Sequence, residues 1–145
     1  MTATTITKTI FLNAPRTHVW AFLTEKDKLA RWFHPAVEDL KEGADYTLLD
    51  QHGDMERICW GKVLEMKPHE RLVYTFTVKP LNGAMTTVRW LLEDAVGGTR
   101  LTLVHEGIEQ AAGEAAFMML SALDAGWDEH FGRFRVQVRE AVPAE

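Results

Sequence analysis

Side chains that could act as nucleophiles are few in this sequence. Ser121 is the only serine and Cys59 the only cysteine. Nucleophilic catalysis needs such a group beside an activating base, yet Ser121 lies in a helical pattern without a G-x-S-x-G turn, and Cys59 has no histidine near it in the sequence. A single cysteine also excludes an internal disulfide and a C-x-x-C zinc site. We therefore expect no catalytic nucleophile.

The histidines show no spacing that suits a metal ion. The six are His18, His34, His52, His69, His105 and His130. No two of them form an H-x-x-x-H pair. Glu129 and His130 are adjacent, so they would point in different directions on a helix. We expect neither a metal nor another cofactor.

His105 is the histidine best placed for a role inside the fold. Strand alternation puts it on the same face as Leu101 and Leu103, which we expect to point inward. Two interpretations stay open: a hydrogen-bonded core histidine, or a polar group in a binding cavity. Together with Tyr74, it could also supply the acid–base catalysis that an enzyme of the polyketide cyclase type needs.

Two arginines are further candidates for polar groups inside the fold. An inward arginine could hold a ligand carboxylate in a forked hydrogen-bond pair. Alternation places Arg89 on the face opposite Val88 and Trp90, and so toward solvent. For Arg57 the pattern leaves both directions open.

Six segments are predicted to be β-strands, because β-branched and aromatic residues are enriched in them and turn residues bound them. They are Thr5–Leu12, Asp45–Asp50, Met55–Met66, Arg71–Val78, Met85–Glu93 and Thr99–Glu106. Turns are predicted at 51–54 and 67–70, and hairpins at Asn82-Gly83 and Gly97-Gly98.

Helical patterns flank these strands. Two short helices are predicted at Pro15–Leu23 and Glu25–Phe33, the second opened by a capping box from Thr24 to Asp27.

The last third, Glu114 to Ala141, has apolar residues at steps of three and four, which is typical of one long helix. Those residues are Ala116, Leu120, Leu123, Trp127, Phe131, Phe134 and Val138. Gly126 and Gly132 each cost about 1 kcal/mol against alanine in a helix. Two interpretations stay open: a continuous helix, or one with a kink or break near Gly126.

This order of elements predicts an α+β fold in which one long helix crosses a curved antiparallel sheet of six to seven strands. The chain of 145 residues is long enough for one sizeable core, and we expect a single domain over residues 1–145. One helix cannot fill the concave side of such a sheet. We therefore expect a cavity between the two.

The ordered stretches resemble the START-like or Bet v 1-like helix-grip superfamily (SRPBCC), and more narrowly its bacterial branch related to the activator of Hsp90 ATPase (Aha1). The matching stretches are "NAPRTHVWAFLTEKDKLARWF", "GKVLEMKPHERLVYTF", "VRWLLEDAVGGTRLTLVHEG" and "GWDEHFGRF". The resemblance implies the helix-grip fold and a central cavity. It does not imply one activity, because this fold hosts lipid carriers, hormone receptors, cyclases and cochaperones.

The predicted function is binding of a small hydrophobic or amphipathic ligand, such as a lipid, in that cavity, as a carrier or sensor without covalent chemistry. We interpret Trp20 and Trp32 as core residues that fix the short helices. Trp32 lies nearer the expected cavity mouth and joins the candidate ligand contacts. These contacts are Trp32, Tyr74, Phe76, Trp90, Leu92, Leu101, Leu103, His105, Phe117, Leu120, Leu123, Trp127 and Phe131. The alternatives are a fully packed core, the acid–base enzyme, or the contact with the Hsp90 chaperone that the Aha1 resemblance implies.

Composition excludes other classes of function. The net charge of -5, without a basic cluster, argues against nucleic-acid binding. The longest apolar run, Ala115–Leu120, is too short to span a membrane, and the N-terminus lacks a signal-peptide pattern. We expect a cytoplasmic protein without stable membrane insertion. The sequence leaves the oligomeric state and the ligand's identity open.

Overall fold

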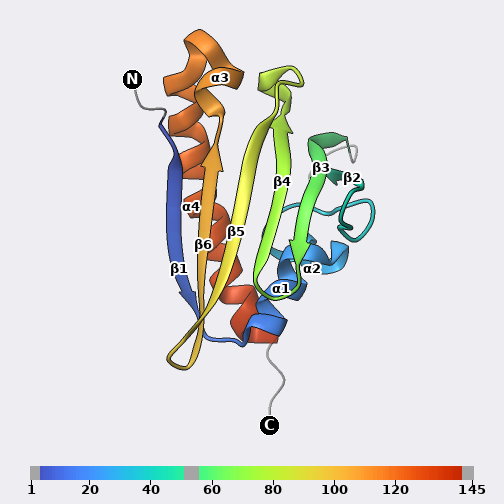
Figure 1. The fold of residues 1–145 in the computed structure, drawn as a ribbon, viewed down its shortest axis with the longest axis vertical. Coiled ribbons are helices and arrows are strands. Elements are labelled where there is room, and N and C mark those ends of the chain that lie inside the picture. The colour runs from blue at the N-terminus through green and yellow to red at the C-terminus, as the bar shows by residue number, and fades with distance from the viewer. Residues whose placement is uncertain (1–3, 51–55, 142–145) are drawn as a thin grey trace.

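The computed structural model describes residues 4–50 and 56–141. Within these ranges, six antiparallel strands form one sheet in the order β1-β6-β5-β4-β3-β2. Figure 1 shows α4 running along the face behind the sheet, with α1 and α2 at its lower end. The elements are β1 (Ile6–Leu12), α1 (Arg16–Thr24), α2 (Lys26–Trp32), β2 (Asp45–Leu49), β3 (Arg57–Lys67), β4 (Arg71–Val78), β5 (Thr86–Ala95), β6 (Gly98–Glu106), α3 (Ile108–Ala112) and α4 (Ala116–Ala141), with 3-10 turns at Lys79–Leu81 and Gly113–Ala115. This is the predicted α+β helix-grip architecture.

Both predicted hairpins form, but their turns differ in detail from the sequence signals. Ala95 pairs with Gly98, so the β5–β6 connection consists of Val96 and Gly97. Gly98 belongs to the strand instead, where a Cβ would lie 2.1 Å from a backbone oxygen of β1. Asn82 and Gly83 both have positive φ, as a tight hairpin requires. They close a longer connection, however, because the 3-10 turn comes before them.

The capping box predicted at Thr24 and Asp27 does not form. The Thr24 hydroxyl donates to the carbonyl of Trp20 at 3.0 Å, which is a bond within α1. The first backbone N–H of α2, at Lys26, donates instead to the Asp39 carboxylate at 2.8 Å. A carboxylate distant in sequence therefore caps this helix, which the local pattern could not reveal. The predicted turn at 51–54 and residue Met55 lie outside the described residues.

Helix α4 is continuous through Gly126 and Gly132, so the glycines do not break it. It starts two residues later than predicted, because α3 and the 3-10 turn at Gly113–Ala115 precede it. The sequence pattern had not predicted α3. Tertiary packing of the helix overrides the weak intrinsic preference of two glycines.

Trp32 is a core residue at the centre of the junction between the short helices, the sheet and α4. Its side chain is 1% exposed, and its indole N–H donates to the carbonyl of Phe22 at 2.8 Å. Its ring centroid lies 4.2 Å from Phe134 on α4 and 6.0 Å from Trp90 on β5. Trp20 is also buried. Both tryptophans are therefore core residues of the short helices, as predicted, and Trp32 joins them to α4.

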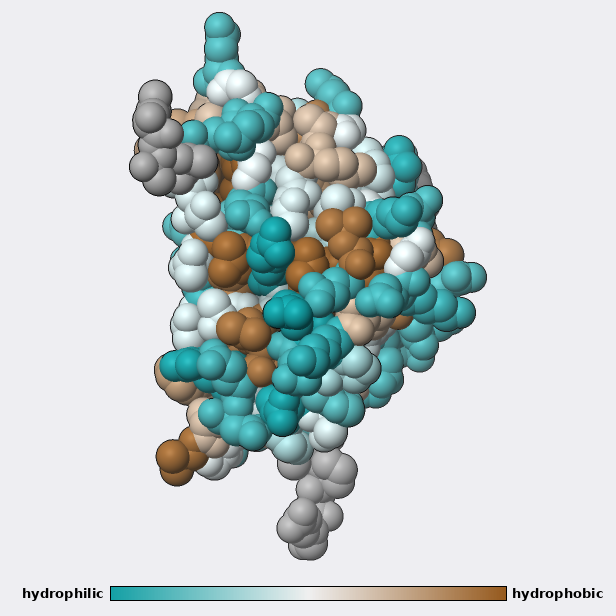
Figure 2. Space-filling view, in the orientation of Figure 1, coloured by the Kyte–Doolittle hydropathy of each residue, from teal (hydrophilic) through white to brown (hydrophobic). Residues whose placement is uncertain are grey.

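The outer face of the sheet, seen in Figure 2, is largely hydrophilic with separate apolar patches. Ion pairs join neighbouring strands there: Arg89 contacts Glu106 at 2.6 Å, and Arg100 contacts Glu93 at 2.8 Å. The prediction that Arg89 faces solvent is confirmed. Arg57 is exposed as well and stacks on the Trp60 ring at 3.8 Å.

Candidate functional site

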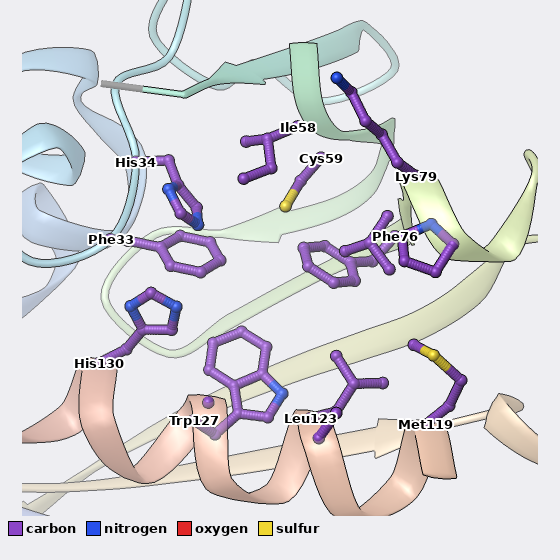
Figure 3. A pocket seen from close by; sticks show the side chains of 14 residues that line it. Phe33, His34, Ile58, Cys59, Phe76, Lys79, Met119, Leu123, Trp127 and His130 are labelled. Carbon is purple, nitrogen blue, oxygen red and sulfur yellow. The ribbon is translucent and has the colours of Figure 1, made fainter. Parts of the chain in front are cut away.

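A cavity of about 450 Å³ lies between the first half of α4 and strands β3 and β4. In Figure 3, the side chains of α4 form one side of it and Ile58 and Cys59 of β3 the opposite side. The volume lies within the range typical of small-molecule sites. The lining residues are Phe33, His34, Ile58, Cys59, Phe76, Val78, Lys79, Pro80, Met119, Ala122, Leu123, Gly126, Trp127 and His130.

The cavity exists because the two halves of α4 are buried to different extents. In the second half, Trp127, Phe131, Phe134 and Val138 are at most 4% exposed. In the first half, Met119, Leu120 and Leu123 are only partly buried against the core. Gly126 lies at the junction, and a Cβ added to it would meet no atom within 4 Å. The first half of the helix therefore leaves space over the sheet.

Three aromatic rings of the lining are stacked or nearly so. The ring centroids of Phe33 and Trp127 are 5.3 Å apart with 27° between their planes. Phe33 and Phe76 are 6.3 Å apart at 19°. The three rings come from the end of α2, from β4 and from α4, so three separate elements must meet to form this wall. Figure 3 shows them together beside the cavity.

A buried hydrogen-bond chain holds the indole of Trp127. Its N–H donates to Nδ1 of His105 at 3.0 Å. Because indole is only a donor, Nδ1 must accept and the imidazole proton lies on Nε2. Nε2 is 2.7 Å from the hydroxyl of Thr86, which donates onward to the carbonyl of Phe76 at 2.6 Å. His105 is therefore fully hydrogen-bonded, and burial lowers its pKa to about 4.

Two histidines and a lysine supply the polar groups of the lining. His34 and His130 face each other at one end, with ring centroids 5.2 Å apart. Burial, and then the nearby His34 and Arg133, lower the pKa of His130 to about 3. Lys79 lies toward the other end (Figure 3) and pairs with Glu56 at 2.6 Å. The site thus presents the neutral imidazole of His130 and one ammonium that is paired with a carboxylate.

Cys59 gives the cavity no reactive nucleophile. Its side chain is 3% exposed, and burial raises the pKa of the thiol to about 12. The thiolate is the reactive form of cysteine, so this residue acts as an apolar wall. Within residues 4–50 and 56–141, no group of histidine, cysteine and acidic side chains could hold a metal ion. No helix there is both long and apolar enough to cross a membrane.

Comparison with known proteins identifies the family. The family model described as "Activator of Hsp90 ATPase homolog 1-like protein" matches residues 13–138. The chain belongs to this family. Its members share the helix-grip fold of the SRPBCC, or Bet v 1-like, superfamily that the sequence resembled, and the fold is that of a cavity-containing module of the ligand-binding or cyclase-like type. A search of curated proteins found no match.

Solved structures of similar proteins have the same fold as this family member. CalU16 from Micromonospora echinospora is 25% identical with a TM-score of 0.74, over 94% of this chain and 76% of its own. BH1534 from Bacillus halodurans is 25% identical with a TM-score of 0.74, over 95% and 99%. DynU16, from the dynemicin biosynthetic locus, is 24% identical with a TM-score of 0.73, over 93% of this chain. This chain spans 46% of the length of DynU16.

Of the residues proposed from the sequence of this family member, three line the cavity: Phe76, Leu123 and Trp127. The others that are buried lie in the core beside it and do not line it. They are Trp32, Tyr74, Trp90, Leu92, Leu101, Leu103, His105 and Phe131. Leu120 is half-buried and does not line it either.

Phe117 is the proposed residue that the structure places elsewhere. It is 81% exposed, because it follows directly on the first residue of α4 and lies off the stripe of residues that faces the core. Its place among the cavity walls was therefore wrong. The lining residues outside the proposed set include His34, Ile58, Met119 and His130. Met119 and His130 carried a signal in the sequence, since they lie four residues before Leu123 and three residues after Trp127 on one helix face.

Proposed function

We propose that this protein binds one small hydrophobic or amphipathic molecule in the cavity under α4, as a carrier or sensor without covalent chemistry. The observation that carries the proposal is an apolar cavity of about 450 Å³ beside a well-packed core. The cavity is partly open to solvent, since Lys79 and Pro80 in its lining are exposed. A site of this size, lined largely by aromatic rings and aliphatic side chains, suits an apolar ligand.

The buried polar groups support binding over acid–base catalysis. The catalytic pair considered from the sequence, His105 and Tyr74, is at most 4% exposed and does not line the cavity. The Tyr74 hydroxyl accepts from the indole of Trp90 at 3.0 Å, and burial raises the pKa of Tyr74. A general acid or base must reach the substrate with a pKa near the working pH. These two residues stabilise the core instead.

Two glycines of α4 provide a matched test. Gly126 lines the cavity, whereas Gly132 lies six residues further on, beside β1, and does not. Neither would bring a new Cβ within 4 Å of another atom. Both Gly126→Leu and Gly132→Leu should stabilise the helix by about 1 kcal/mol, measured by urea unfolding. Only Gly126→Leu should occupy ligand space.

The measurement is fluorescence titration with N-phenylnaphthylamine, an uncharged apolar probe. We expect one site per chain, an affinity lowered about tenfold in Gly126→Leu, which is about 1.4 kcal/mol, and no change in Gly132→Leu. Equal affinity in both variants, or no binding of the probe to the wild-type chain, would contradict the proposal.

A further inference from the structure

The polar end of the cavity is built around His130, whose tautomer its neighbours fix. A guanidinium nitrogen of Arg133 lies 2.5 Å from Nδ1 of His130. A guanidinium is only a donor, so Nδ1 must accept, and the proton of the neutral ring lies on Nε2. The Nε nitrogen of Arg133 donates to the Trp32 carbonyl at 3.2 Å, which fixes the guanidinium in turn.

The second ring nitrogen of His130 is directed to the ligand space. Figure 3 shows it on the side of the ring toward Trp127 and the cavity, with His34 and Phe33 above it. His130 lines the cavity. Its Nε2–H therefore offers a hydrogen-bond donor at this end of the cavity, beside His34. His130 is half-buried, so a ligand that brings an acceptor to this nitrogen preserves its hydrogen bond when it displaces solvent.

Charge complementarity argues that this acceptor is uncharged. The positive groups near the lining are already paired: Lys79 with Glu56 at 2.6 Å, and Arg133 with Glu129 at 3.7 Å. Burial lowers the pKa of His130, so the ring is neutral at pH 7. A carboxylate moved into this site would lose its hydration without gaining an opposite charge. A carbonyl or ether oxygen costs far less to bury.

The shape of the wall argues that the ligand is flat. Phe33, Phe76 and Trp127 lie with their planes within 39° of one another. A planar ring system can stack on more than one of them at once, while a flexible aliphatic chain cannot. Resting on the proposed binding function, we infer that the ligand is an uncharged planar aromatic molecule whose carbonyl or ether oxygen accepts a hydrogen bond from Nε2 of His130.

The test compares two ligands of one shape. Acetylnaphthalene and isopropenylnaphthalene, substituted at the same ring position, differ by a C=O in place of a C=CH₂ group. Without a hydrogen-bond donor in the cavity, acetylnaphthalene should bind no tighter than isopropenylnaphthalene, because its carbonyl group loses its hydration on binding. With the donor, we expect the ketone to bind the wild-type chain at least about fivefold tighter, which is about 1 kcal/mol. The carbonyl stretch of bound acetylnaphthalene should also shift to lower frequency.

A variant in the cavity and a control variant outside it locate the donor. His130→Phe should abolish both the preference for the ketone and the frequency shift, while isopropenylnaphthalene still binds. Lys62→Met, at an exposed position of β3 that does not line the cavity, should leave both unchanged. The inference is overturned if the two ligands bind equally, or if naphthoate binds best and depends on Lys79. N-phenylnaphthylamine tests the cavity alone. If the inference is overturned but this probe still binds, the proposed binding function is retained. If the probe does not bind, the proposed function itself is wrong.

Discussion

Single buried side chains fix the positions of the aromatic residues that line the cavity. The indole of Trp127 is tied to the carbonyl of Phe76 through His105 and Thr86, so two lining residues on different elements share one hydrogen-bond chain. Each donor in the chain meets one acceptor. An imidazolium at position 105 would leave the Trp127 N–H facing a second donor, because both nitrogens would then carry protons.

His105 should make the stability of the fold depend on pH. Its pKa is about 4 in the folded protein against 6.5 in an open chain, so between these values the unfolded state binds more protons. Stability is therefore fully present above about pH 6.5 and falls as the pH drops toward 4. For His105 alone, the loss between pH 7 and pH 5 should be about 2 kcal/mol.

Urea unfolding at the two pH values checks this expectation. The pH-dependent loss should be smaller in His105→Gln than in the wild-type chain by that amount, with His130 contributing in the same direction in both. If the variant does not fold, the NMR titration of the His105 ring in the wild-type protein is decisive. A midpoint near 6.5 would contradict the buried neutral ring.

At the scale of elements, α4 combines two kinds of packing in one uninterrupted helix. From Trp127 onward, its inner residues are buried against β1, α2 and the sheet, as far as Val138. Before Gly126, its inner residues reach only partial burial. The same periodicity runs through both halves. The structural difference is therefore in what lies opposite the helix and not in the helix itself.

Hydrogen exchange should distinguish the two halves. Backbone amides of residues 116–126 should exchange faster than those of residues 127–138, because fewer buried contacts hold the first half closed. Saturation with N-phenylnaphthylamine should protect the amides of residues 116–130, which carry the lining side chains of α4, and leave those of residues 131–138 unchanged. Exchange followed by mass spectrometry on peptides from each half measures this. Equal protection along the whole helix would show that the cavity does not loosen it.

At the scale of the whole molecule, one connected core joins elements from both ends of the described chain. Ile6 of β1, Trp32 of α2 and Val138 of α4 belong to the same buried cluster. The cavity borders this cluster and does not divide it. The largest set of lining residues comes from α4, which covers the concave side of the sheet.

We therefore propose that the chain unfolds as one cooperative unit, as expected of a single domain. Tryptophan fluorescence, which reports the aromatic core, and far-ultraviolet circular dichroism, which reports the backbone, should give the same urea midpoint. Ligand at a hundred times its dissociation constant should raise the free energy of unfolding by about 2.7 kcal/mol in both signals. Two separate transitions would indicate that α4 or the short helices form an independent unit.

The sequence by itself determined the order of the elements, the inward face of the strands and the α+β helix-grip class. Alternation placed Trp90, Leu101, Leu103 and His105 inside, and they are fully buried. These features follow from local periodicity, which each segment carries within its own residues. The family resemblance followed from the same ordered stretches and is confirmed by the match over residues 13–138.

Only the tertiary structure decided where the cavity lies and which side chains line it. Burial on the inner face did not distinguish a core residue such as Leu103 from a lining residue such as Phe76, because both obey the same alternation. His34 follows the end of α2 and belongs to no periodic pattern in the sequence. His130 lies beside it only because α4 crosses the end of α2. A cavity is a property of the distance between elements, and no segment encodes that distance alone.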